Sequence, residues 1–359
     1  MKTKIILLAA GLATSWIAAP AVDLAIEDIQ LKNAPAFAVI GVEPTSVEKP
    51  TSARRLAMNI AGAASGGKVG NIAIETAPYW WTGGKDVTFD DYYAGQDVMQ
   101  NAVRSFTLSL ATKDAKIAPA AGDTSGSSLG VGFRTRLWVG ALSEDAKASK
   151  QKLVQAAQAM AAKVDSGGWG DVPLDGHVDS HTQVDDTVAG ALAPNIKALR
   201  EAVKNPVGFE LELAGAVGFE SETDTLSSPK WKRWGAWLNA SYRPKAGTSS
   251  LDFVGTVRYL KTKLANDDFD NFDVGARVVW AVPRQPVSVS AEYVQRFRGQ
   301  ALDNTRRFAL IAEYALSDTM SVYVTNGKDF AKGATDTRET FTFVGLNFSL
   351  AKPGAVKVQ

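Results

Sequence analysis

The chain has 359 residues and a formal net charge of +1, because 39 lysines and arginines almost balance 38 aspartates and glutamates. This balance implies neither nucleic acid nor an acidic membrane surface as a partner. The chain has no cysteine, so no disulfide can stabilise its fold.

Residues 1–21 have the features of a signal peptide. Lys2 and Lys4 precede the apolar run 5–10, and residues 19–21 read Ala-Pro-Ala, a typical cleavage site. We therefore expect an exported protein. No later run approaches the roughly 20 apolar residues of a spanning helix, so a membrane could be crossed only by strands.

Residues 22–51 contain a short apolar run at 36–42 between prolines 35, 44 and 50. Proline disfavours the interior of a strand. We expect this segment to be a periplasmic or lumen-entering lead segment and not a strand of the wall.

Residues 52–350 are dominated by segments in which apolar and polar residues alternate. This period of two is typical of strands with one apolar face. The count is about twelve, an even number as in bacterial single-chain barrels. The expected strands lie at 52–61, 71–81, about 105–110, 129–142, 207–219, 231–243, 251–261, 272–282, 287–298, 306–316, 320–326 and 341–350.

Charged side chains occupy one parity of these segments, whereas the other parity carries long apolar side chains such as Phe209, Leu211 and Leu213. In a soluble sandwich the apolar parity would face a core instead. A lysine or arginine on the lipid face at mid-bilayer costs about 2 to 4 kcal/mol, so in a membrane these charges must face the lumen. The predicted lumen residues are Arg134, Arg136, Glu210, Glu212, Arg233, Arg243, Asp252, Arg258, Asp273, Arg277, Glu292, Arg296, Arg298 and Glu313.

The alternating segments and the terminal strand at 341–350 resemble those of bacterial outer-membrane β-barrel proteins, the porin-like class. The resemblance implies an all-β fold: a closed antiparallel transmembrane β-barrel of about twelve strands in the outer membrane of a Gram-negative bacterium. It also implies contact with outer-membrane lipids and lipopolysaccharide. One departure is the tail at 351–359, because many such barrels end on the final strand.

Aromatic residues cluster at strand ends, as in the girdles of membrane barrels. The alternative is that they cap a soluble core. They are Tyr79, Trp80, Trp81, Trp231, Trp234, Tyr242, Tyr259 and Trp280.

Residues 143–204 interrupt the strands with two segments of helical composition, the first opened by Ser143 as a candidate cap. Short turns mark the periplasmic side of a barrel and long loops the outer side. By this rule the insertion, between the fourth and fifth strands, lies in the periplasm, where it could bind a partner protein.

His177, Asp179 and His181 place three metal-ligand types at a spacing of two. If the segment is extended, these side chains share one face, so a metal site is possible. A solvated polar loop is the alternative. The acidic loop at 266–271 could likewise bind divalent cations or be merely solvated.

The charged lumen suggests a passive or weakly selective channel for small polar solutes. Alternatively, Arg–carboxylate pairs close the lumen of a structural barrel whose insertion docks a partner. No catalytic residue and no cofactor is predicted, because both histidines lie in the insertion and away from any candidate nucleophile. An enzyme is therefore not expected.

Overall fold

The computed structural model describes the barrel strands, the helices and the short segments next to them. The described residues are 22–25, 34–42, 46–48, 56–63, 71–82, 87–93, 97–113, 127–165, 180–203, 207–221, 229–244, 251–263, 268–282, 285–299, 303–317, 320–330, 340–349 and 355–358. The predicted signal peptide lies outside them.

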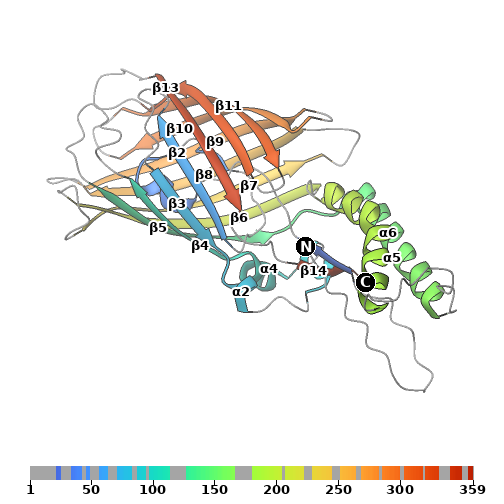
Figure 1. The fold of residues 1–359 in the computed structure, drawn as a ribbon. Helices are drawn as coiled ribbons and strands as arrows, with labels where there is room; N and C mark the ends of the chain where they lie inside the picture. The colour runs from blue at the N-terminus through green and yellow to red at the C-terminus, as the bar shows by residue number, and fades with distance from the viewer. Residues whose placement is uncertain are drawn as a thin grey trace.

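Twelve antiparallel strands form a closed barrel (Figure 1). Each pairs with its neighbour in the chain, and β13 pairs with β2 to close the ring. The predicted fold class is confirmed. The strands are β2 (Leu56–Ala63), β3 (Asn71–Thr76), β4 (Thr107–Lys113), β5 (Ser128–Trp138), β6 (Gly208–Glu220), β7 (Lys230–Arg243), β8 (Leu251–Lys263), β9 (Asp268–Ala281), β10 (Val287–Arg298), β11 (Thr305–Ser317), β12 (Met320–Lys328) and β13 (Thr340–Ser349).

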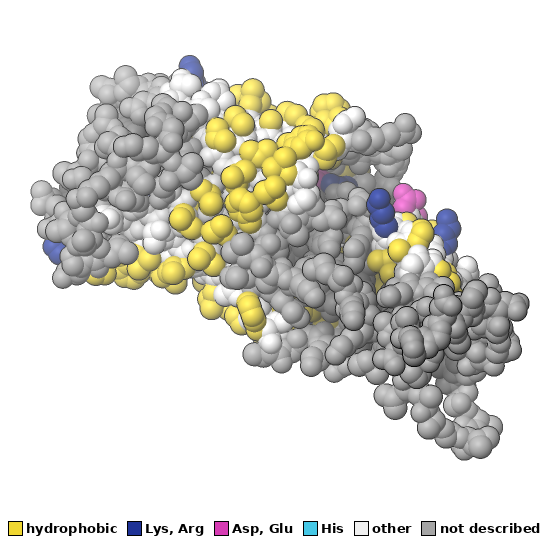
Figure 2. All heavy atoms as spheres, in the orientation of Figure 1, with side chains coloured by type: hydrophobic (Ala, Val, Ile, Leu, Met, Phe, Trp, Pro, Cys, Tyr) yellow, Lys and Arg dark blue, Asp and Glu magenta, His cyan; other side chains and the backbone are white. Residues whose placement is uncertain are grey.

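The outer face of the barrel is apolar. Along β11 buried and exposed residues alternate, and Phe308, Leu310 and Tyr314 face outward. Figure 2 shows hydrophobic side chains covering much of the visible wall. An apolar surface of this extent is not stable in water, whereas a closed barrel satisfies all its backbone groups in lipid. The protein is therefore a transmembrane barrel of the outer-membrane type.

Phe209 lies on this outer face and is 46% exposed. A soluble sandwich would have buried it between two sheets. The alternative of a soluble core is therefore excluded for the strands that the structure describes.

An arginine in the middle of the outer wall should destabilise the barrel strongly. Leu310 is 51% exposed at the middle of β11, and Leu316 is 50% exposed near the end of the same strand. We expect Leu310→Arg to lower the free energy of unfolding from lipid vesicles by about 2 to 4 kcal/mol, and Leu316→Arg by about 1 kcal/mol or less, because the cost depends on depth. Equal losses at the two positions would contradict this placement of the membrane.

The insertion between β5 and β6, the fourth and fifth barrel strands, folds as two helices, α5 (Glu144–Asp165) and α6 (Ser180–Val203). Ser143 Oγ accepts a hydrogen bond from Ala146 N at 3.1 Å, which confirms the predicted cap. Among the described helices none combines the length and apolar character needed to cross a membrane.

Two short strands from the N-terminal and C-terminal parts of the chain pair beside this insertion (Figure 1). There β1 (Val22–Ala25) pairs with β14 (Ala355–Val358) in a two-stranded sheet outside the barrel. The tail predicted at 351–359 thus contains a strand that contacts the start of the lead segment.

The connection between β3 and β4 differs from its prediction. The strand expected at 71–81 ends at Thr76, because Pro78 cannot donate a hydrogen bond to a strand ladder. The connection to the next barrel strand contains helices. These are α2 (Tyr79–Thr82), α3 (Phe89–Tyr93) and α4 (Val98–Ser105).

Trp80 does not belong to a membrane girdle, so that prediction was wrong. It is 1% exposed and packs edge-on against Tyr92 at 5.6 Å between ring centroids. Both belong to a hydrophobic cluster that also holds Leu153, Leu199 and Val358. The helices α2, α3, α5 and α6 and strand β14 therefore share one small core at the insertion end of the barrel.

Candidate functional site: the barrel lumen

The predicted lumen residues all project from the inner parity of their strands. Three are half-buried, Arg233, Arg296 and Arg298. The other eleven are less than 9% exposed: Arg134, Arg136, Glu210, Glu212, Arg243, Asp252, Arg258, Asp273, Arg277, Glu292 and Glu313. The barrel interior is thus densely charged and largely filled.

A chain of ion pairs links β7 to β10. The guanidinium of Arg243 on β7 binds the carboxylate of Asp252 on β8. Asp273 on β9 is 0% exposed and binds two guanidiniums, at 2.7 Å from Arg258 on β8 and 2.7 Å from Arg296 on β10. Such two-point pairs are strong and directional, so they fix these side chains along the wall.

A second group of pairs joins β3, β5 and β6. Arg134 lies 2.5 Å from Glu75, and Arg136 lies 3.9 Å from Glu210. Asn239 donates to Glu212 at 3.1 Å. These contacts offset part of the cost of burying the charges.

The lumen contains part of the lead segment, namely residues 34–42 and 46–48, here called the lumen segment. Within it, α1 (Pro35–Val39) is buried and contacts β4, β5, β6 and β7. Ala36 N donates to Ser109 Oγ on β4 at 3.1 Å. Gly130 and Gly218 make this approach possible, because a side chain at either would press against the backbone of α1.

Residues 46–48 are held by another part of the wall. The Glu292 carboxylate on β10 accepts hydrogen bonds from Ser46 N and Val47 N, both at 2.9 Å. Arg277 on β9 donates to Val47 O at 3.3 Å, and Glu48 lies 3.6 Å from Arg134. The lumen segment therefore reaches from β4–β7 to β9 and β10 and returns to β5.

The wall formed by β12, β13 and β2 carries buried amide and hydroxyl side chains. Asn59 and Asn347 are cross-strand partners, each 3% exposed, and Thr325, which is fully buried, lies farther along this wall on β12, opposite Phe343. Among the described residues, Asn59 Nδ2, both amide atoms of Asn347 and Thr325 Oγ1 have no hydrogen-bond partner in the protein. Buried polar atoms of this kind need hydration, so this polar wall favours the entry of water.

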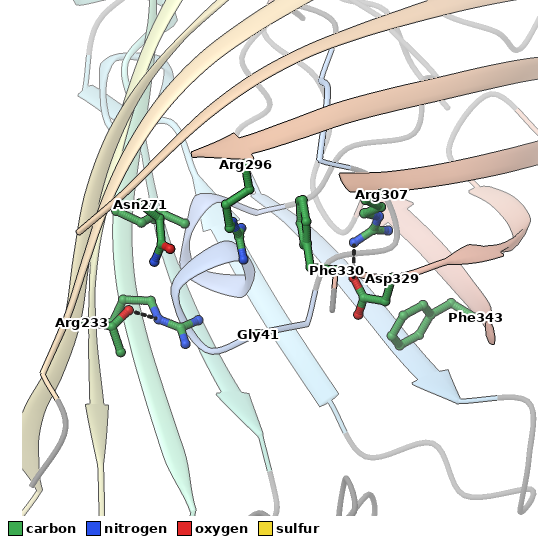
Figure 3. Close-up of a pocket in the computed structure, with 10 residues that line it drawn as sticks. Gly41, Arg233, Asn271, Arg296, Arg307, Asp329, Phe330 and Phe343 are labelled. Carbon is green, nitrogen blue, oxygen red and sulfur yellow. Dashed lines mark hydrogen bonds and ion pairs between the residues drawn. The ribbon is translucent and has the colours of Figure 1, made fainter. Parts of the chain in front are cut away.

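A cavity of about 130 Å³ lies beside the lumen segment, toward the end of the barrel away from the helical insertion. Figure 3 shows Arg233, Arg296 and Arg307 from different strands around it, with Gly41 of the lumen segment at its border. Asp329 is the one carboxylate among the residues that line it in the described part of the chain. Three arginines face this space, and carboxylates lie beside two of them: Arg296 pairs with Asp273, and Arg307 lies 3.5 Å from Glu292 as well as 3.8 Å from Asp329.

The predicted metal site is not brought together by the described residues. His177 and Asp179 lie outside them. His181 is the second residue of α6, so the extended conformation on which its spacing argument depends does not continue through it, and its side chain is not described.

Sequence reasoning missed several charged residues of the lumen. Glu75 and Arg307 were missed although the alternation of their strands points them inward. Glu75 lies on the same side of β3 as the buried Ala73, and Arg307 lies on the same side of β11 as Glu313. Glu48 offered no such signal, because it lies in the lumen segment and its partner Arg134 is remote in sequence.

The chain matches no known protein-family model and no curated protein. Among solved structures it is similar to the NanC porin, with 9% identity and a TM-score of 0.39 over 82% of this chain and 100% of that one. It is similar to the KdgM porin, with 9% identity and a TM-score of 0.37 over 82% and 99%. An outer-membrane channel from Pseudomonas putida F1 matches with 10% identity and a TM-score of 0.36 over 84% and 97%. At this level the similarities carry no argument about substrate.

Proposed function

We propose that this protein is an outer-membrane channel for small polar solutes that rests closed, with the lumen segment as its gate. The observation that carries the proposal is how this segment is held. Glu292 binds Ser46 N and Val47 N, and Arg277 binds Val47 O, so one end is attached to the wall by charge-assisted hydrogen bonds. Such contacts can be exchanged for contacts with water. The other end, residues 34–42, packs against apolar side chains of the wall, among them Ala214, Ala216 and Trp237.

We expect the solute to cross the barrel along the polar wall. Asn59, Asn347 and Thr325 lie along β2, β13 and β12, whereas α1 contacts β4 to β7. A solute passing along this wall would meet amide and hydroxyl groups, which bind polar molecules without a preference for one sign of charge. The charged pairs on the remaining wall would then restrict the bore and provide weak selectivity.

The test is the Glu292→Gln variant in single-channel recordings across planar bilayers. The neutral amide keeps the size of the side chain but weakens both hydrogen bonds from the lumen segment. We expect the open probability to rise about tenfold or more, because hydrogen bonds to charged groups contribute roughly 1.5 to 3 kcal/mol.

Glu313→Gln is the matched control. Glu313 is also a buried carboxylate of the wall, and it accepts a hydrogen bond from Ser321 at 2.9 Å. We expect its open probability to stay close to that of the unmodified protein. Recordings in which the unmodified protein and both variants are folded but never open would contradict the channel.

The second candidate is a structural barrel with a permanently closed lumen, whose insertion docks a periplasmic partner. The nearly complete burial of the lumen charges favours it, as does the separate hydrophobic core around Trp80, Leu153 and Leu199. Replacing residues 144–203 by a short linker should then remove a co-purifying partner from the native membrane while the barrel still folds. Unchanged partners after this replacement would count against docking.

A further inference from the structure

We infer that the cavity bounded by Arg233, Arg296 and Arg307 is a binding site for the carboxylate or phosphate group of a small anionic solute. It lies toward the barrel end opposite the helical insertion, where Arg233 is the fourth residue of β7, Arg307 the third residue of β11 and Arg296 the third residue from the end of β10. Anion binding in this cavity does not depend on whether the barrel conducts, because the cavity is present in the closed barrel.

Arg296 is held in place for this role. Its Nε and Nη2 donate to the two oxygens of Asp273 at 2.7 and 2.8 Å. Its guanidinium lies 3.7 Å from the ring centroid of Phe330, a stacking distance. The carboxylate and the ring fix the plane of the guanidinium, and the Nη1 edge remains for a ligand.

The other two arginines enclose the same space from separate strands (Figure 3). Arg233 Nε donates to Thr262 Oγ1 at 3.0 Å, which directs its guanidinium inward from β7. Arg307 is 3% exposed, stacks on Phe341 at 4.5 Å and lies 3.8 Å from Asp329. Guanidinium groups converging from three strands match the oxygens of a carboxylate or phosphate, which they bind in pairs of hydrogen bonds.

Size and charge restrict the ligand. A volume of about 130 Å³ corresponds to about four water molecules, so the cavity holds one anionic group and not a whole drug-sized molecule. A cation would meet three arginines, and the nearby carboxylates Asp273, Glu292 and Asp329 already pair with Arg296 and Arg307. The hydroxyl oxygens of a neutral sugar can accept hydrogen bonds from Arg296, but they carry no charge to balance its guanidinium, so an anion is the better ligand.

The test uses the full chain, purified and folded in detergent micelles, with inorganic phosphate and acetate as separate probes. Saturable exchange broadening of the phosphorus signal of phosphate, and of the methyl signal of acetate, reports binding in solution. We expect Arg296→Gln to weaken binding about tenfold or more, because it removes the fixed charged donor. Arg233→Gln, a half-buried position that should leave folding intact, is expected to weaken binding severalfold.

Lys261→Gln is the matched control. Lys261 is near the same end of the barrel on β8 and pairs with Asp268 at 3.3 Å, and its change removes the same charge. Binding of either probe that depends on Arg296 and Arg233 but not on Lys261 supports the site, and the preferred probe distinguishes phosphate from carboxylate. No saturable binding, or equal weakening by all three variants, would overturn it.

Discussion

A disulfide between the lumen segment and the wall should lock the channel shut. The Cβ of Val39 lies 3.4 Å from the position that a Cβ on Gly218 would take, close to the separation of about 3.8 Å in disulfides. The chain has no cysteine of its own, so Val39→Cys with Gly218→Cys offers a single possible bridge. We expect the oxidised double variant to lose conductance almost completely and a reductant to restore it.

Two single variants serve as controls for this experiment. Gly218→Cys places its Cβ 3.0 Å from Val39 O, so the neighbouring backbone must shift by a few tenths of an ångström. This change alone could disturb gating, and its recordings should not respond to the reductant. An oxidised, cross-linked double variant that conducts as well as its reduced form would show that movement of α1 does not control the pore.

Replacing Asp273 should give the largest loss of stability among the lumen carboxylates. Asp273 is fully buried and accepts from Arg258 at 3.0 and 2.7 Å and from Arg296 at 2.7 and 2.8 Å. In Asp273→Asn two guanidiniums lose their shared anion. We expect the free energy of unfolding to fall by about 3 to 5 kcal/mol, the typical cost of breaking a buried pair.

Asp268→Asn provides the comparison on the same strand. Asp268 pairs with Lys261 at 3.3 Å, and its side chain is 46% exposed. An exposed pair contributes about 0 to 1 kcal/mol, so this variant should unfold nearly as the unmodified protein does. Denaturant titrations in lipid vesicles measure the free energy of unfolding of both variants. A small loss for Asp273→Asn would mean that water already screens this carboxylate, and the lumen would then be more open than described.

The architecture was predictable because it depends on local alternation. Outward Phe209 and inward Glu210 follow each other along β6, and a slip of one residue would place the charge in lipid. The same parity rule would have found Arg307, which lies six residues before Glu313 on β11. The helical insertion was predictable from composition and from the cap at Ser143.

The position of the lumen segment could not be predicted in the same way. Pro35 and Ala36 give no sign of their neighbours, because the room for α1 is made by Gly130 and Gly218, which are remote in sequence. Trp80 was misplaced for a similar reason. Its burial depends on Tyr92 and on α5, and not on its position at the end of a strand.

The central claim is that the lumen segment closes a barrel that would otherwise conduct. The most direct measurement is the single-channel conductance of a variant lacking residues 34–48, compared with the unmodified protein in the same bilayer. We predict a steadily open pore for the deletion variant and brief, infrequent openings for the unmodified protein. The same conductance and open probability for both folded barrels would contradict the claim.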